Sequence, residues 1–170
     1  MLRVQFAHGL ESSPQGNKAR LLAQHFETET PSMNTRNFES CVAVHAGTAM
    51  RFRPDVLVGS SFGGAVAVAL LERGLYRGPT LLLAQAAVLY RPLVRLPEGV
   101  RVLLVHAPLD EVVPFQGSVQ LAATGTQGLV ELIEREDNHA LSGLIASGEL
   151  IQLVQRIASA PAVTAVAACH

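Results

Sequence analysis

The sequence predicts a three-layer α/β/α sandwich with a mostly parallel central sheet. Short apolar runs alternate with stretches of helical spacing along nearly the whole chain, the pattern of a parallel sheet covered by helices on each side. Some of these runs, residues 56–58 and 80–84 among them, are almost wholly apolar, as expected of strands buried on both faces. A glycine-rich segment at residues 59–64 joins one such run directly to a helical pattern, which indicates a sharp strand-to-helix turn.

The first part of the chain predicts a strand, two helices and a poorly patterned segment between them. Residues 2–7 alternate into a strand, and an amphipathic helix follows over about residues 15–26. Residues 28–38 are polar, and we expect one short strand there, near residues 33–35. A second helix is expected over residues 39–51.

The middle of the chain predicts a strand on each side of a helix. The first strand begins after residues 54–55 and ends at the glycine-rich turn. The helix after the turn extends to about residue 72, because Gly74 ends it. Residues 80–84 predict the next strand, and the proline-containing residues 86–99 predict a loop or short helical excursion over the sheet.

The last part predicts two further strand–helix units. Residues 100–105 form a buried strand, followed by a loop and a helix that ends near residue 123. A strand is expected at about residues 129–134, then a loop that carries His139, and a closing helix over about residues 148–157.

Size and composition predict one domain. The chain has 170 residues, of which 49% are hydrophobic and 16% charged. This is enough to bury a substantial core but not enough for two full domains. We assign the domain to residues 1–158 and a C-terminal tail to residues 159–170.

Charge and cysteine content argue against several classes of partner and ligand. The net charge of −1 and the absence of Lys/Arg clusters argue against a nucleic acid or a membrane surface as the main partner. Cys41 and Cys169 are far apart and lack metal-ligand spacing, so we expect two reduced thiols, no metal and no cofactor. The first residues carry no basic or apolar leader, and we expect a cytoplasmic protein. The oligomeric state stays open.

The glycine-rich turn points to a serine nucleophile. Ser61 is the centre of a Gly-x-Ser-x-Gly pattern, with Gly59 and Gly63 two residues to either side. Side chains at those two positions would collide with the neighbouring strand and helix. A turn centred on Ser60 would put larger residues there, so Ser61 is the predicted nucleophile.

Three predicted strands are followed by loops that carry, in order, a serine, an aspartate and a histidine: Ser61, Asp110 and His139. In an open α/β sheet such loops meet at the carboxyl edge, where ligands bind. A serine hydroxyl needs a base, and the base needs a carboxylate to fix its tautomer. Attack on a carbonyl also develops an oxyanion, for which we expect the backbone N–H groups of Phe62 and Leu10 as donors.

Four segments resemble the α/β-hydrolase family, and more narrowly its small, nearly capless bacterial serine esterases. They are residues 8–14, residues 59–64, Leu109-Asp110-Glu111-Val112-Val113-Pro114, and Asn138-His139-Ala140. The resemblance covers nearly the whole chain and implies a reduced α/β-hydrolase fold. It also implies that Asp110 is the triad acid.

Two features of this chain depart from that family or limit its site. The strand before the acid ends in His106-Ala107, where such proteins often have His-Gly, and we expect this to alter the loop more than the chemistry. Residues 80–100 leave no room for a large lid, so the resemblance implies a shallow, open pocket and short or medium acyl groups.

Several residues keep a structural alternative at this stage. Asp110 could cap the following helix, with Asp137 as the rival acid two residues before His139. His139 could be a surface histidine. His8 could contact substrate or brace the oxyanion loop by a hydrogen bond.

For the substrate pocket we name His8, Tyr90 and Leu141, and we expect Leu10, Phe62 and Tyr90 to face the substrate. Val112 and Phe115 are expected to be ordinary core residues.

The sequence therefore predicts a serine hydrolase that cleaves small or medium carboxylic esters, or thioesters, through an acyl-enzyme on Ser61. An acyltransferase with the same triad is one alternative. A non-catalytic binding protein with the same fold is the other, because a fold does not determine a function.

Overall fold

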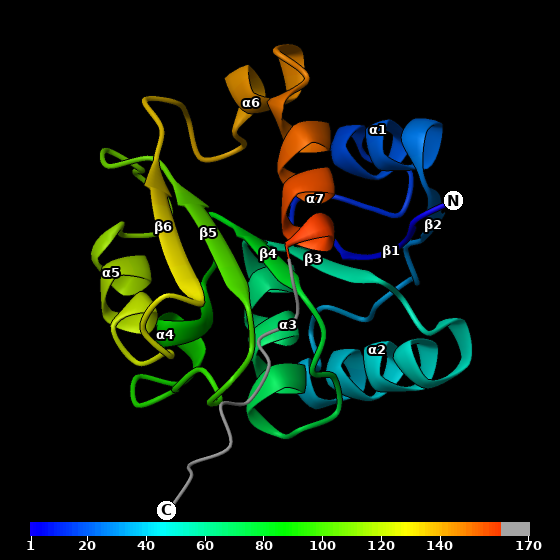
Figure 1. The fold of residues 1–170 in the computed structure, drawn as a ribbon, viewed down its shortest axis with the longest axis horizontal. Helices are drawn as coiled ribbons and strands as arrows, with labels where there is room; N and C mark the ends of the chain where they lie inside the picture. Colours follow the sequence, from blue (N-terminus) through cyan, green and yellow to red (C-terminus); the bar gives the residue numbers. More distant parts are fainter. Residues whose placement is uncertain (161–170) are drawn as a thin grey trace, which may run out of the picture.

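The computed structural model describes residues 1–160, and these form one six-stranded sheet in the order β2-β1-β3-β4-β5-β6. All five strand pairs are parallel. Figure 1 shows the strands side by side, with helices on both faces of the sheet. The strands are β1 (Arg3–Ala7), β2 (Glu27–Glu29), β3 (Val56–Ser60), β4 (Thr80–Leu83), β5 (Val102–His106) and β6 (Val130–Glu134).

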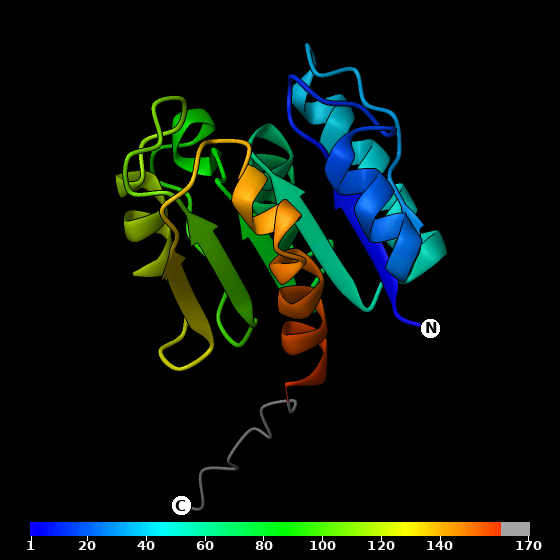
Figure 2. The ribbon, with the colours of Figure 1, turned by 90° about the horizontal axis from the view of Figure 1, so that it is seen from above.

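The helices divide between the two faces, which confirms the predicted three-layer α/β/α class. On one face lie α1 (Asn17–His25), α6 (Ser142–Ala146) and α7 (Glu149–Ser159). Figure 2 shows α1 and α7 side by side on this face. The other face carries α2 (Phe38–Phe52), α3 (Phe62–Glu72), α4 (Ala87–Tyr90) and α5 (Gln116–Ala122).

The two cores follow from alternation along the strands. Val56 and Val58 of β3 pack in the core under α1 and α7, whereas Leu57 between them packs against α2 and α3. Neighbouring side chains of a strand point to opposite faces, so a strand between two helix layers is apolar at every position. The central strands β3 and β4 are accordingly buried at every residue.

The structure corrects two expectations about the elements. No strand forms at residues 33–35; the short edge strand β2 lies earlier, at Glu27–Glu29, where it pairs with β1. The polar sequence of β2 hides it, because an edge strand is only partly buried. The helix α6 was not expected. The helix α7 ends at Ser159, and residues 161–170, which hold most of the assigned tail and Cys169, lie outside the described residues.

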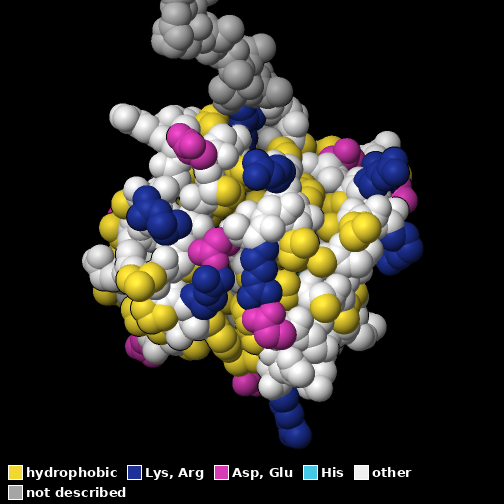
Figure 3. Space-filling view, turned by 90° about the horizontal axis from the view of Figure 1, so that it is seen from below, with side chains coloured by type: hydrophobic (Ala, Val, Ile, Leu, Met, Phe, Trp, Pro, Cys, Tyr) yellow, Lys and Arg dark blue, Asp and Glu magenta, His cyan; other side chains and the backbone are white. Residues whose placement is uncertain are grey.

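The surface mixes charges of both signs. Figure 3 shows one face, on which Lys and Arg side chains are interspersed with Asp and Glu. Several arginines form ion pairs with glutamates, among them Arg51 with Glu29 and Arg73 with Glu39. Among residues 1–160, no helix has the length and apolar character that crossing a membrane requires.

A buried polar pair connects β1 to α2. The Nε2 group of Gln5 donates hydrogen bonds to Nδ1 and to the backbone oxygen of His45, both at 2.9 Å. Both side chains are fully buried. Burial lowers the pKa of His45 to about 4, and the nearby His8 contributes to the shift. The imidazole is therefore neutral in the folded protein at neutral pH.

We expect His45 to make the folded protein less stable in mild acid. Because its folded-state pKa lies below the value of about 6.5 for an unperturbed histidine, protonation favours the unfolded chain. Its contribution is intact above about pH 6.5 and is lost as the pH falls towards about 4. Urea unfolding should show a loss of ~2 kcal/mol from this group between about pH 7.5 and pH 5.

The variant His45→Gln should remove that part of the pH dependence, since glutamine can still accept from Gln5 but does not titrate. His25→Gln deletes an exposed histidine of α1 and should leave the wild-type pH dependence in place. If His45→Gln and the wild-type protein lose stability equally in acid, the effect does not come from His45.

Candidate active site

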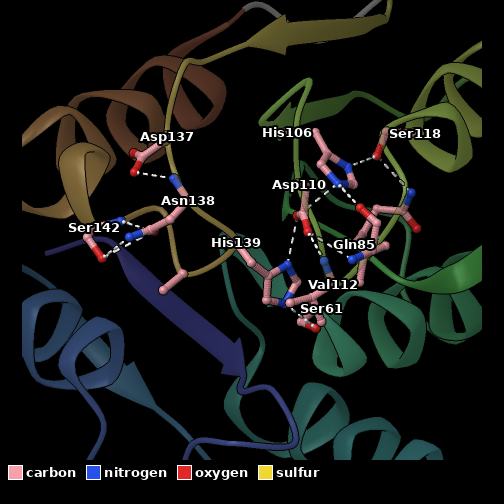
Figure 4. A network of polar contacts seen from close by, with 12 residues as sticks. Ser61, Gln85, His106, Asp110, Val112, Ser118, Asp137, Asn138, His139 and Ser142 are labelled. Atoms are coloured by element: carbon pink, nitrogen blue, oxygen red, sulfur yellow. Dashed lines mark hydrogen bonds and ion pairs between the residues drawn. The ribbon is translucent and has the colours of Figure 1, made fainter.

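The candidate site lies at the carboxyl edge of the sheet, where three loops converge (Figure 4). Ser61 follows β3, Asp110 lies in the loop after β5, and His139 lies in the loop between β6 and α6. Parallel strands place these loops on one edge, which is where open α/β sheets bind ligands.

The turn after β3 holds Ser61 in a strained conformation. Its φ is +53° and its ψ −116°, a region that residues with a Cβ rarely adopt. Its backbone N–H donates to the oxygen of Leu83 at 2.9 Å, and its backbone oxygen accepts from Ala86 at 3.1 Å. Ser60, in contrast, is the last residue of β3 and is buried. The backbone therefore presents Ser61 at the tip of the turn.

Two glycines of this turn have no room for a side chain. A Cβ at Gly59 would lie 2.7 Å from the backbone oxygen of Gly63, and a Cβ at Gly63 would lie 1.9 Å from the backbone oxygen of Ala7. The first contact is with the start of α3 and the second with the end of β1. The expected collisions with the neighbouring helix and strand are therefore present at both positions.

The side chains of Ser61, His139 and Asp110 are connected by hydrogen bonds. Nε2 of His139 lies 3.0 Å from Oγ of Ser61, and Nδ1 lies 2.7 Å from Oδ2 of Asp110. Because a carboxylate only accepts, Nδ1 carries the proton and Nε2 accepts from the serine hydroxyl. This is the arrangement that base activation of a serine requires.

The carboxylate of Asp110 accepts three hydrogen bonds and faces a fourth N–H group. Oδ1 accepts from the backbone N–H groups of Val112 and Val113, both at 2.8 Å. Oδ2 accepts from His139 and faces Nε2 of His106 at 3.2 Å. Burial acts to raise the pKa of Asp110, but the hydrogen bonds from His139, Val113 and Val112 outweigh it and lower the pKa below the usual range. The carboxyl group is therefore ionised at neutral pH, although its side chain has no exposed surface.

Behind Asp110 lies a buried network that the sequence did not reveal. Nε2 of His106 also lies 2.9 Å from the backbone oxygen of Val113, and its Nδ1 lies 2.7 Å from Oγ of Ser118. Oγ of Ser118 in turn accepts from Nε2 of Gln85 at 2.9 Å. Figure 4 shows His106, Ser118 and Gln85 on the side of Asp110 away from Asp137 and Ser142. His106, Ser118 and Gln85 are each at most 1% exposed.

The partners of His106 determine its tautomer. Nε2 faces two oxygens that can only accept, a carboxylate and a carbonyl, so it carries the proton. Burial lowers the pKa of His106 and outweighs its interactions with the acceptors Val113 and Asp110, which raise the pKa, so the ring is neutral. Nδ1 then accepts from the hydroxyl of Ser118, and the Nε2–H group lies between the backbone oxygen of Val113 and the carboxylate of Asp110.

The rival acid has a different role. Asp137 accepts hydrogen bonds from the backbone N–H groups of Gly143 and Leu144, at 3.2 and 3.0 Å. These are at the start of α6, so Asp137 stabilises the first turn of that helix. Among residues 1–160 its carboxylate makes no hydrogen bond to His139, and Asp110 is the carboxylate that contacts His139.

The loop after β1 passes beside Ser61. A Cβ built on Gly9 would lie 3.4 Å from Cβ of Ser61. Nδ1 of His8 lies 2.8 Å from the backbone oxygen of Gly9, so the side chain of His8 contacts the backbone of this loop. Within the described part of the chain, the backbone N–H groups of Leu10 and Phe62 have no hydrogen-bond acceptor. Both donors are thus free for an oxyanion.

A cavity of about 680 Å³ opens beside the serine. Its wall includes Leu10, Ser12, Lys18, Ser61, Val112 and His139. Across residues 1–160, no group of three His, Cys, Asp or Glu side chains is arranged to hold a metal ion.

The cavity corrects the expected substrate pocket. Leu141 is fully buried in the core under α1 and α7, so it cannot contact a substrate. Tyr90 lies outside the cavity wall, stacked on Phe38 with ring centroids 5.3 Å apart, and the buried ring of Phe62 packs against both. Val112, expected in the core, is 65% exposed and lines the cavity. His8 is buried and is not part of the wall.

The sequence matches no family model and no curated protein, but solved structures resemble the fold. A protein of the α/β superfamily of hydrolases from Xanthomonas campestris pv. campestris has a TM-score of 0.75 at 21% identity, over 92% of this chain and 99% of that one. The esterase domain of a Rhodothermus marinus protein has a TM-score of 0.65 at 15% identity, over 93% and 88%. Est1E from Butyrivibrio proteoclasticus has a TM-score of 0.69 at 14% identity, over 91% and 86%.

These similarities show that the chain has the α/β-hydrolase fold. The resemblance seen in the sequence is confirmed at the level of the fold. The features of this chain that belong to that fold are the sheet order and the turn at Ser61.

We expect Gly63→Ala to destabilise the protein by about 3 kcal/mol, because the new Cβ would overlap backbone that cannot yield. The matched control is Gly47→Ala in α2. A Cβ at Gly47 meets nothing within 4 Å, so alanine should stabilise this exposed helical position by up to about 1 kcal/mol. Chemical denaturation measures both, and equal stabilities for Gly63→Ala and wild type would contradict the steric account of the turn.

Proposed function

We propose that this protein is a serine hydrolase that cleaves small or medium carboxylic esters through an acyl-enzyme on Ser61. One observation carries the proposal: Oγ of Ser61 lies 3.0 Å from Nε2 of His139, whose Nδ1 lies 2.7 Å from the ionised Asp110. A neutral imidazole so oriented can accept the serine proton as the hydroxyl attacks.

In the first half of the reaction, Oγ of Ser61 attacks the acyl carbon and its proton passes to Nε2 of His139. The carbonyl oxygen becomes an oxyanion, which accepts hydrogen bonds from the N–H groups of Leu10 and Phe62. Asp110 accepts from Nδ1–H and stabilises the imidazolium. His139 then gives the proton to the departing alcohol, which leaves the acyl group on Ser61.

In the second half, water takes the place of the alcohol. His139 accepts a proton from the water as its oxygen attacks the acyl carbon, and then returns a proton to Oγ of Ser61 as the carboxylic acid leaves. The cavity supports substrates of small or medium size, because its volume of about 680 Å³ suits a small molecule. The resemblance to an esterase domain and to Est1E is consistent with ester bonds as the target.

The proposal predicts selective labelling of Ser61. A fluorophosphonate probe should label the wild-type protein stoichiometrically, and peptide mapping after intact-mass spectrometry should place the label on Ser61. Ser61→Ala should abolish labelling and ester hydrolysis, whereas Ser60→Ala should retain labelling because Ser60 lies within β3. A folded wild-type protein that takes up no label would favour the non-catalytic binding protein. If a competing alcohol or amine captured most of the acyl group, the acyltransferase would replace the hydrolase.

A second prediction concerns His106, which acts through Asp110 rather than on the substrate. His106→Phe removes the N–H that faces Oδ2 of Asp110 and should lower kcat roughly tenfold with KM unchanged, the effect of one hydrogen bond to a charged group. His106→Gln can still donate and should restore part of the loss. Phe115→Leu alters packing against the same ring without removing a donor, and an equal effect on kcat there would mean that His106 contributes only packing.

A further inference from the structure

The cavity beside Ser61 contains the only lysine of the sequence. Lys18, near the start of α1, is half-buried and lines the same wall as Ser61 and His139. All other fixed cations of the chain are arginines. A half-buried ammonium group in the same cavity as a candidate nucleophile is a specific feature of this site, since lysine is ordinarily a surface residue.

The ammonium group of Lys18 is only partly compensated. Nζ donates one hydrogen bond, to the backbone oxygen of Ala140 at 2.7 Å, which holds it one residue from His139. Among the described residues, no carboxylate forms an ion pair with it. Burial lowers the pKa of Lys18, and the attraction of Asp137 only partly opposes this. A charged group removed from water is normally paired.

Nearby carboxylates do not supply the missing partner. Both oxygens of Asp137 accept backbone N–H groups at the start of α6, so this side chain is fixed there. Glu11 also lines the cavity, but its side chain is exposed to water. The two remaining N–H donors of Lys18 are therefore available to a molecule in the cavity.

A hydroxyl group lies on the same wall. Ser12 lines the cavity, and its Oγ would lie 2.3 Å from a Cβ at Gly16. The absence of a side chain at Gly16 lets this hydroxyl pack against the backbone before α1. An ammonium and a hydroxyl donor on one wall are groups that bind a carboxylate.

We propose that the cavity binds esters that carry a carboxylate group, and that Lys18 binds this carboxylate while Ser61 faces the ester. This inference rests on the proposed hydrolase function and names its substrate class. The bound anion would supply the ion pair that Lys18 lacks, in a site partly shielded from water, where such a pair is stronger than on the surface.

Two isosteric substrate pairs test the proposal. Monoethyl adipate and ethyl hexanoate differ by a carboxylate on the acyl side, and 3-acetoxybenzoate and 3-methylphenyl acetate differ by one on the alcohol side. In at least one pair, the wild-type protein should have the higher kcat/KM for the anion. Lys18→Met should lower the anion-to-neutral ratio of kcat/KM by about 10- to 100-fold, the effect of one charged hydrogen bond. Lys18→Arg keeps the charge and should retain most of the ratio.

The ratio separates substrate binding from a purely structural role. If Lys18 only connects α1 to the His139 loop through Ala140, Lys18→Met will slow both members of a pair equally, and the unchanged ratio would overturn the proposal. A wild-type ratio near one in both pairs would also overturn it.

A binding measurement keeps this inference distinct from the hydrolase function. In Ser61→Ala protein labelled with ¹⁵N-lysine, the single Nζ signal reports on Lys18 alone. Monoethyl adipate should shift this signal saturably and ethyl hexanoate should not. Saturable shifts without any ester hydrolysis by the wild-type protein would support the anion site and refute the hydrolase. Hydrolysis without an anion-specific shift would support the hydrolase and refute the anion site.

Discussion

The structure depends on one steric constraint, which is that the backbone around Ser61 passes its neighbours too closely for a Cβ atom. Gly63 lies against the end of β1, and Gly64 lies against Gln85, where a Cβ would be 2.6 Å from the Cβ of that residue. Three segments are therefore fixed at one point: the loop after β1, the turn after β3 and the segment after β4. The loop after β1 carries the N–H group of Leu10. The segment after β4 carries Gln85, the first residue of the hydrogen-bonded network behind Asp110. The same close contacts thus arrange both sides of the site.

The parts of the fold that sequence alone predicts are those in which burial and local pattern agree. The strands β3 and β4 are central and apolar at nearly every position, so their limits were found to within a residue or two. The edge strand β2 is only three residues long and polar, and its partner β1 stabilises it through backbone bonds that carry no side-chain signal. The short helix α6 begins directly after Leu141, whose backbone is left-handed, and Asp137 accepts from its first N–H groups, a contact that periodicity does not encode.

The residues of the site also fall into those that the sequence predicts and those that it does not. Ser61, Asp110 and His139 each follow a strand, so topology alone predicts that they meet. His106 and Ser118 have partners that only the folded chain brings together, and the sole local sign was a histidine four residues before the acid. The sequence alone could not predict which residues line the cavity either, because this depends on which side chains the small helices α4 and α6 bury or expose.

Two charged groups of the site differ in how completely the protein solvates them. The anion Asp110 accepts three hydrogen bonds and faces the N–H group of His106, and its side chain has no exposed surface, so the folded protein replaces its hydration shell. The cation Lys18 has one acceptor for three donors. A group solvated in full needs nothing from a ligand and is suited to hold His139 in one orientation, which is the preorganisation that proton transfer requires. A group solvated in part gains most when an anion enters, which is the property of a binding site. The difference between the two environments therefore supports the proposed division of roles, in which Asp110 orients His139 and Lys18 binds the substrate.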